Sequence, residues 1–233
     1  MAAKPQLACF ERLGAPGWTA LSRTIDAAHD AGLLVIADGK RGDVPVSAAA
    51  YAQALFGSTA SPFGDVPGLG ADAATLNGTL GRDSLAPLIE GAEEAGAGLF
   101  VLVRTSNPGA SDLLDQPAPE SPFHERLAAM VAELGSGLQS ESGLSGLGAV
   151  VGATEPAHIA RLRELMPSAP FLLPGVGAQG GSVKDLGPAF GSHPASAIVT
   201  ASRSIAGADD PGEAAEALRQ EVWEVACRAL DTG

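Results

Sequence analysis

Residues 33–47 read LLVIADGKRGDVPVS, an apolar run that changes abruptly into charged residues and then into a second apolar stretch. Leu33 to Ala37 are continuously apolar, as expected for a parallel strand that is buried on both faces. The Ala-rich stretch from Val46 to Phe56 follows the charged residues and predicts a helix. The segment therefore predicts one βα unit whose connecting loop carries the charges.

The same alternation of short apolar runs and Ala/Leu-rich stretches recurs along the chain. Further strands are predicted at 73–76, 99–103, 149–151, 171–173 and 197–200, and further helices at 18–31, 83–95, 123–138, 156–166, 182–190 and 212–230. Together with a strand within residues 2–10, these runs make seven strands, whereas a (β/α)₈ barrel has eight.

We therefore predict a TIM (β/α)₈ barrel with the N-terminal strand and helix missing, so that this chain holds seven βα units. Residues 1–233 are predicted to form a single domain of this kind, truncated at the N-terminus. An open, doubly wound sheet is the competing architecture, but no G-x-G-x-x-G follows the early strands.

The composition narrows the class of protein and its partners. With 45% apolar and 18% charged residues, the chain is typical of a globular protein. A formal net charge of −13 argues against nucleic-acid binding, because neutralising phosphates needs a surplus of Lys and Arg. Cys9 and Cys227 suit a reducing compartment, and neither a leader nor an apolar window of about 18 residues is visible. We expect a cytoplasmic protein with no membrane partner.

Asp38, Lys40 and Asp43 follow the predicted strand at its carboxyl end, where the active sites of TIM barrels lie. Asp38 and Lys40, two residues apart, leave the strand on the same side. Two carboxylates beside one ammonium would keep the lysine charged, and a crowded carboxylate can destabilise a bound anion. A solvated charge cluster in a turn remains an open interpretation, because charged loops are common.

Two loops later in the chain have the composition of a phosphate site. Residues 174–181 read PGVGAQGG between a predicted strand and a predicted helix, and TASR at 200–203 follows the next strand. Glycines let backbone N–H groups approach a phosphate, and a guanidinium adds a positive charge. The loops after strands 7 and 8 recurrently bind phosphate in TIM barrels, so the pair indicates an anionic ligand.

The chain resembles the orotidine 5'-phosphate decarboxylase family, in particular the branch found in actinobacteria and some other bacteria. The matching segments, in family order, are KPQ at 4–6, FER at 10–12, VIADGKRGD at 35–43, TSNP at 105–108, VVGAT at 150–154, PGVGAQG at 174–180 and SR at 202–203. The resemblance implies a cofactor-free decarboxylation of orotidine 5'-phosphate to UMP, in de novo pyrimidine biosynthesis.

The resemblance also implies roles for single residues. Lys40 matches the lysine that protonates C6 as carbon dioxide leaves, and Asp38 matches the carboxylate set against the substrate carboxylate. Lys4 and Asp43 complete a Lys-Asp-Lys-Asp array, in which the partner subunit of a homodimer supplies the last Asp. Ser47 stands where the family usually has a Thr that reaches the neighbouring site.

The remaining matches concern the ring and the phosphate of a nucleotide substrate. Thr105 and Ser106 match the residues that contact the pyrimidine, and the phosphate-binding residues match Gly177, Gln179, Ser202 and Arg203. The implied protein is a homodimer with a shared active site and without a metal. In agreement with this, no histidine spacing suggests a metal site, and His124, His158 and His193 are expected at the surface.

Two departures from the family pattern leave other functions open. The family's first strand, with an Asp that holds the ribose, has no counterpart, and Asn77-Gly78 replaces the usual Pro-Tyr. One alternative is an inactive or phosphate-ligand-binding paralogue. The other is a metal-dependent sugar-phosphate decarboxylase of the same superfamily, which shares the Asp-x-Lys-x-x-Asp pattern. The TSNP and PGVGAQG segments favour the nucleotide enzyme.

Overall fold

The computed structural model describes residues 1–117, 121–177, 179–191 and 193–231. The chain divides into two compact units, residues 1–102 and 103–233, and each is described by itself. Organisation as a single domain therefore stays a prediction. Within the described ranges, no helix is both long enough and apolar enough to span a membrane.

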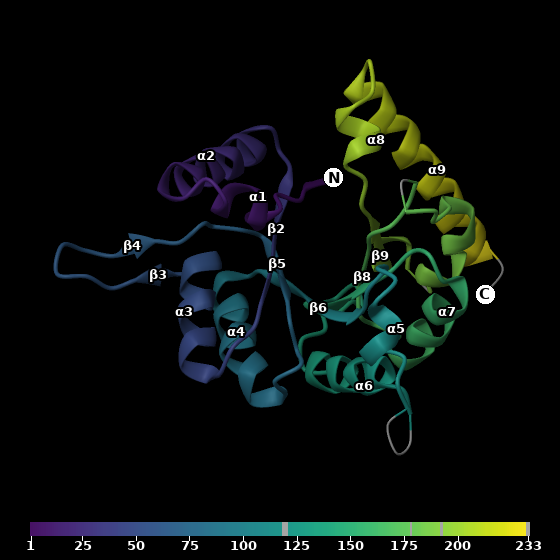
Figure 1. The fold of residues 1–233 in the computed structure, drawn as a ribbon, viewed down its shortest axis with the longest axis horizontal. Coiled ribbons are helices and arrows are strands. Elements are labelled where there is room, and N and C mark those ends of the chain that lie inside the picture. Colours follow the sequence, from purple (N-terminus) through teal and green to yellow (C-terminus); the bar gives the residue numbers. More distant parts are fainter. Residues whose placement is uncertain (118–120, 178, 192, 232–233) are drawn as a thin grey trace. The chain divides into compact units, whose positions relative to one another are not determined.

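The first unit is built on parallel strands with helices between them (Figure 1). Its strands, in order of pairing, are β1 (Ala2–Ala3), β2 (Leu34–Arg41), β5 (Ala73–Leu76) and β6 (Gly98–Arg104), which runs on into the second unit. Its helices are α1 (Leu7–Glu11), α2 (Ala15–Asp30), α3 (Pro45–Leu55) and α4 (Arg82–Ala95). A small antiparallel hairpin of β3 (Ser58–Thr59) and β4 (Val66–Pro67) follows α3.

Small and apolar side chains let these elements pack closely. All four residues of β5 are buried, as the continuously apolar pattern of a parallel strand requires. Helices α3 and α4 lie side by side (Figure 1), and Gly91 of α4 faces Ala52 of α3. A Cβ atom at Gly91 would lie only 2.7 Å from the Cβ of Ala52, so this contact needs glycine.

The second unit continues the βα pattern. Its strands β7 (Leu147–Val151), β8 (Phe171–Leu173) and β9 (Ala197–Val199) are parallel, and each pairs with the next. The accompanying elements are α5 (Ala110–Leu113), α6 (Phe123–Gly135), α7 (Pro156–Leu165), the 3₁₀ helices η1 (Val183–Ala189) and η2 (Pro194–Ser196), α8 (Arg203–Ala206) and α9 (Pro211–Asp231). Helices α6 and α7 pack against each other, and η1 packs against α7 and α9.

The predicted α/β class with seven parallel strands is confirmed. Several local features differ from the sequence-based expectation. Within residues 2–10 the strand is confined to Ala2–Ala3, and α1 begins at Leu7. Strand β2 continues to Arg41, so Asp38 and Lys40 lie within it and not in a loop. Residues 183–189 form a 3₁₀ helix that contains Pro188, a residue unsuited to the interior of an α-helix. The β3–β4 hairpin was not predicted, because its two-residue strands have no alternating apolar pattern.

Candidate active site

Asp38 is the centre of a charged cluster in the first unit. Its Oδ2 lies 2.5 Å from Nζ of Lys4, and its Oδ1 pairs with Nζ of Lys40. Lys4 reaches Asp38 because the N-terminal segment runs parallel to β2, with Ala3 opposite Val35. The sequence suggested two carboxylates around one ammonium, whereas this chain places one carboxylate between two ammonium groups.

A bulge in β2 brings Lys40 back toward Asp38. Ala37 pairs with Ala74 and Arg41 with Leu76, so three residues of β2 lie opposite Thr75 alone. Lys40 has a φ of +50°, a left-handed conformation that is uncommon for residues other than glycine. The hydroxyl of Thr75 supports the bulge, since it accepts the N–H of Lys40 at 3.0 Å and donates to Oδ1 of Asp38 at 2.9 Å.

The two lysines determine the charge of Asp38. Burial by itself raises the pKa of this carboxyl, but the hydrogen bonds and positive charges of Lys4 and Lys40 outweigh it and hold the pKa below its ordinary value. Asp38 is therefore ionised at neutral pH although it is buried. The side chain of Lys40, in contrast, is 43% exposed, so a ligand can approach it.

Asp43 and Ser47 lie near this cluster in sequence but do not join it. The carboxylate of Asp43 accepts the N–H of Val44 at 2.7 Å, and Ser47 lies in the first turn of α3, half-buried. Among the described residues of this chain, no ion pair links Asp43 to Lys4 or Lys40. The structure therefore assembles three of the four charged residues expected from the sequence.

In the second unit, Thr105 and Ser106 follow directly after β6. Oγ of Ser106 donates to Oε1 of Gln179 at 2.7 Å, which joins the TSNP segment to the glycine-rich segment predicted to bind phosphate. Gly152, which directly follows β7, approaches the backbone of Ser106 so closely that a Cβ at Gly152 would lie 2.9 Å from the Ser106 nitrogen. Two predicted binding segments that are 73 residues apart are thus in contact.

The glycine-rich loop after β8 is a tight turn. The N–H of Gly177 donates to Gly181 O at 2.9 Å, and the N–H of Gly180 donates back to Gly177 O at 2.8 Å. Ala178, within the PGVGAQG segment, lies outside the described residues. After β9, Ser202 immediately precedes α8 and Arg203 begins it, and both are exposed.

Sequence reasoning missed three polar residues that support these segments. Thr75 was treated only as part of an apolar strand, although a single hydroxyl in AATL is a signal that could have been followed. Arg104 and Asp115 form a two-pronged ion pair next to Thr105, with Nη2 to Oδ2 at 2.8 Å. Their spacing in sequence carried no signal, since Asp115 lies in a long loop.

His124 and His158 were expected at the surface. This expectation is wrong for His124, which is only 2% exposed. His158 is half-buried. Residue 124 faces inward because α6 begins immediately before it and turns this side chain toward the loop at Leu114. Together with Asp115, the two imidazoles form a polar cluster of the second unit.

Parallel strands followed by helices, with charged and glycine-rich segments at the carboxyl ends of the strands, define an enzyme of the (β/α) barrel class. The chain belongs to the Orotidine 5'-phosphate decarboxylase / HUMPS family, whose model matches residues 1–218.

Individual relatives agree with this assignment. The chain is 45% identical over 229 residues to an orotidine 5'-phosphate decarboxylase of Deinococcus radiodurans, covering 94% of this chain and 78% of the relative. It is 43% identical over 226 residues to the protein of that name from Rhodopirellula baltica, covering 97% and 74%. The structure of Leishmania donovani OMP decarboxylase matches with a TM-score of 0.78 at 35% identity, covering 97% of this chain and 81% of that one. The predicted barrel class is thereby confirmed.

Proposed function

We propose that this protein is a carboxy-lyase that converts orotidine 5'-phosphate to UMP in pyrimidine biosynthesis. The observation that carries the proposal is the placement of Asp38 between Lys4 and Lys40, in a chain whose relatives at 43–45% identity are named orotidine 5'-phosphate decarboxylases. The family relationship extends over residues 1–218 and so includes every residue to which we assign a role.

The charged cluster suits a decarboxylation that proceeds without a cofactor. Loss of carbon dioxide leaves electron density on C6 of the ring, and with no electron sink this density must be stabilised by a cation already in place. Lys40 is assigned this role and then donates a proton from Nζ to C6. Asp38 is assigned the position facing the substrate carboxylate, where its negative charge disfavours the bound substrate relative to the transition state.

Residues of the second unit are assigned to substrate binding. Thr105 and Ser106 contact the pyrimidine ring, and the phosphate is bound by Gly177, Gln179, Ser202 and Arg203. The contact between Ser106 and Gln179 supports a joint role for these segments, since it couples the ring-binding pair to the phosphate loop. Binding energy at the phosphate can then contribute to catalysis at the ring.

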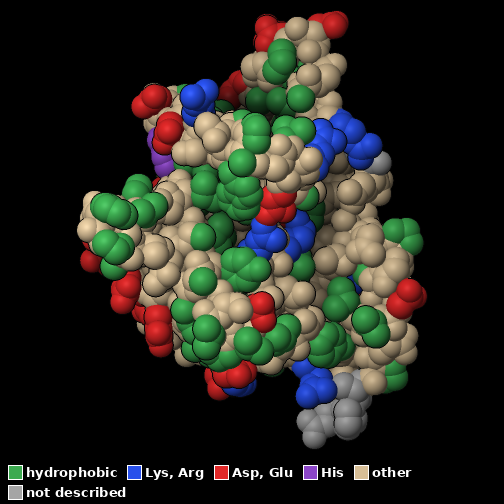
Figure 2. Space-filling view, turned by 60° about the vertical axis from the view of Figure 1, so that its left-hand side comes forward, with side chains coloured by type: hydrophobic (Ala, Val, Ile, Leu, Met, Phe, Trp, Pro, Cys, Tyr) green, Lys and Arg blue, Asp and Glu red, His purple; other side chains and the backbone are tan. Residues whose placement is uncertain are grey.

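The active enzyme is proposed to be a homodimer in which Asp43 and Ser47 reach the partner's site. Apolar residues next to them support this assignment, because Val44 is 54% exposed and Val46 is 85% exposed. Figure 2 shows hydrophobic side chains spread over the face that is turned forward from the left of Figure 1. The support for this assignment is therefore the exposure of these two valines beside Asp43 and Ser47.

A direct assay tests the proposed reaction. The full chain is incubated with orotidine 5'-phosphate, and UMP and carbon dioxide are measured, with Lys40→Ala as the inactive control. Activity should persist after treatment with EDTA. A chain that instead decarboxylates a 3-keto sugar phosphate only with an added divalent metal would be the sugar-phosphate enzyme. Phosphate-ligand binding without either reaction would indicate the inactive paralogue.

The shared site has its own test. Lys40→Ala and Asp43→Ala proteins are mixed under conditions in which subunit exchange is demonstrated by differential labelling. The mixture should regain activity, because each hybrid dimer contains one site with both residues intact. If the mixture stays as inactive as its parents, Asp43 does not act across the interface.

Both cysteines of the chain are free thiols, which suits the cytoplasmic location that we propose with this function.

A further inference from the structure

Arg104, the last residue of β6, is buried, and each of the three nitrogens of its guanidinium donates a hydrogen bond. Its Nε and Nη2 donate to Oδ1 and Oδ2 of Asp115 at 3.2 and 2.8 Å, and its Nη1 donates to the carbonyl oxygen of Thr105 at 2.8 Å. One planar group therefore joins the backbone of Thr105 to the far end of the loop that begins there. Two-pronged pairs of this kind define direction as well as distance.

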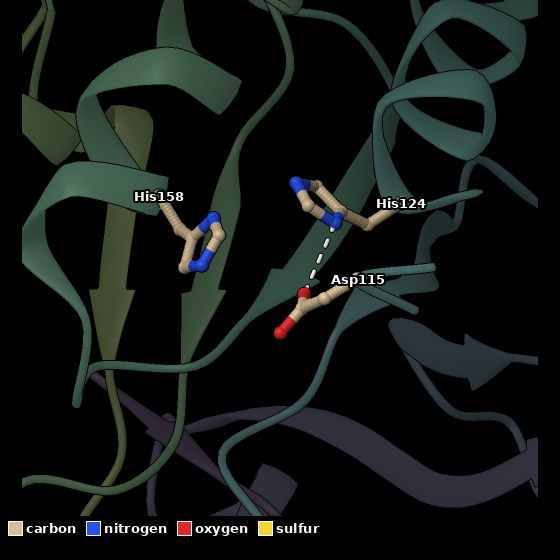
Figure 3. Close-up of side chains that lie close together, drawn as sticks. All are labelled: Asp115, His124 and His158. Carbon is tan, nitrogen blue, oxygen red and sulfur yellow. Dashed lines mark ion pairs between the residues drawn. The ribbon is translucent and has the colours of Figure 1, made fainter. Parts of the chain in front are cut away.

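Asp115 is itself held by the beginning of α6. Nδ1 of His124 lies 3.3 Å from Oδ1 of Asp115 and 2.8 Å from the carbonyl oxygen of Leu114 (Figure 3). The N–H of His124 donates to the same carbonyl at 3.0 Å. Since a carbonyl can only accept, Nδ1 carries a proton. His158 packs edge-on against His124, with ring centroids 4.9 Å apart.

The same three side chains could be considered as a metal site, because Asp115, His124 and His158 place ligand atoms within 4.8 Å of one another. Two features disfavour a cation there. Both oxygens of Asp115 already accept from Arg104, whose positive charge would repel a metal ion. With its proton on Nδ1, His124 keeps a lone pair only on Nε2, whereas the atom that lies 3.3 Å from Asp115 is Nδ1 (Figure 3). The cluster is therefore better suited to hold the loop than to bind an ion.

The consequence for the neighbouring residues follows from peptide geometry. A trans peptide is planar, with its C=O and N–H on opposite sides, so anchoring the Thr105 carbonyl also sets the direction of the Ser106 N–H. Gly152 packs directly against this nitrogen and leaves the peptide little room to rotate. The Ser106 side chain is separately directed by its hydrogen bond to Gln179.

We propose that Arg104, Asp115 and His124 are positioning residues, which hold the Thr105–Ser106 peptide in the orientation in which it contacts the pyrimidine ring. This inference rests on the proposed function, because the ring contact belongs to that function. The three residues act through Thr105 and Ser106, so their loss should weaken recognition of the base far more than recognition of the phosphate, which Ser106 reaches only through Gln179.

Asp115→Ala tests the proposal, with Glu125→Ala as the matched control. Glu125 also accepts two guanidinium N–H groups, those of Arg161 at 3.1 and 3.0 Å, and it is adjacent to His124 in sequence. In Asp115→Ala, UMP affinity and kcat/KM for orotidine 5'-phosphate should fall about 10- to 100-fold, the usual effect of a misplaced contact. Affinity for ribose 5-phosphate should change less than about twofold in the same variant, since the phosphate contacts remain. Glu125→Ala should leave both affinities unchanged.

A measurement without ligand separates this proposal from the proposed function. Backbone ¹⁵N relaxation of the Thr105 and Ser106 amides should show a rigid peptide in the wild-type protein and in Glu125→Ala, and a mobile one in Asp115→Ala. If the amides stay equally rigid in Asp115→Ala, or if both ligands lose affinity equally, the positioning role is wrong. If the wild-type protein neither binds UMP nor decarboxylates, the proposed function fails while the relaxation result still decides the positioning.

Titration with zinc completes the test. Calorimetry of the wild-type protein with ZnCl₂ should show no binding that depends on this cluster. Binding that is lost in both Asp115→Ala and His158→Ala would identify a metal site and overturn the proposal.

Discussion

Asp38 and Arg163 are both ionised side chains that are only 8% exposed, yet they are stabilised in different ways. Asp38, in the first unit, is neutralised by the ammonium groups of two lysines, one of which is exposed. Arg163, in α7 of the second unit, donates only to backbone carbonyl oxygens, and its guanidinium lies 3.7 Å from the centre of the Phe171 ring.

This difference distinguishes Asp38, which can take part in a reaction, from Arg163, which only stabilises the fold. The carbonyls around Arg163 belong to Ala189, Met166, Pro167, Ala169 and Ser196, and they connect α7 with the two 3₁₀ helices. Burial lowers the pKa of Arg163 to about 10, so it remains charged at neutral pH with every donor occupied. The partners of Asp38 are themselves ions, which a charged substrate can redirect. A buried charge indicates function where its partners are charged and accessible.

The largest effect is expected for Lys40→Ala. It should lower kcat by about 10⁴-fold or more, because proton donation and stabilisation of the developing charge are lost together. UMP affinity should stay within about tenfold of the wild-type value, since the phosphate-binding residues are intact. Single-turnover rates and equilibrium binding measure the two effects. A variant that turns over at nearly the wild-type rate would place Asp38 and Lys40 in the same supporting class as Arg163.

Arg203→Ala sharpens the comparison between two arginines of the second unit. Arg203 is exposed, and if it binds phosphate its loss should cost about 2 to 4 kcal/mol in kcat/KM for orotidine 5'-phosphate. Orotidine, which lacks the phosphate, should be decarboxylated equally well by both proteins. Steady-state kinetics with each substrate decide the question. An equal loss with both substrates would remove Arg203 from the phosphate site.

Arg163→Met should lower the stability of the protein and leave its catalytic activity unchanged, the reverse of what is expected for Lys40→Ala. Removal of the guanidinium leaves several buried carbonyl oxygens without donors, which should lower the free energy of unfolding by about 2 to 4 kcal/mol. Turnover per folded molecule should be unchanged. Urea denaturation and active-site titration with a tight-binding nucleotide measure the two quantities. A loss of turnover at full stability would contradict the purely supporting role of Arg163.

The smallest effect concerns pH. Burial, followed by the charges of Arg104 and His124, lowers the pKa of His158 below its ordinary value, while Asp115 and Glu155 partly oppose this. The folded protein therefore binds fewer protons than the unfolded chain near pH 6, and its free energy of unfolding should decrease as the pH falls through and below the ordinary histidine pKa. His158→Gln should flatten this dependence in urea titrations at pH 7, 6 and 5. An unchanged slope would show that His158 does not titrate differently in the two states.

Asp38 should add to the loss of stability at lower pH. Its pKa is held below the ordinary value, so its stabilising interaction is complete above the pKa of an unfolded Asp. The contribution is lost as the pH falls through the folded-state pKa. Asp38→Asn should therefore reduce the steepness of acid unfolding in this lower range and leave the range near pH 6 unchanged.

Most elements could be predicted from the sequence, because burial on both faces leaves a continuous apolar run. The strands at 73–76 and 171–173 begin and end as expected. Asp38, Lys40, Asp43 and the two phosphate-loop segments were singled out from composition and spacing, and the other site residues through motif resemblance. They lie in the carboxyl-terminal parts of strands or in adjoining segments, as a barrel requires. The bulge at Lys40 was not predictable, because it depends on the hydroxyl of Thr75 in another strand.

By itself, the sequence determined the repeated βα pattern, the family and the identity of the charged and glycine-rich segments, since these are local properties of composition and spacing. Only the tertiary structure decided that Asp38 lies between two lysines, that Arg104 joins Thr105 to Asp115, and that Arg163 is surrounded by carbonyls. These contacts join residues from different elements. Their strength depends on distance, direction and burial, which the order of residues along the chain does not specify.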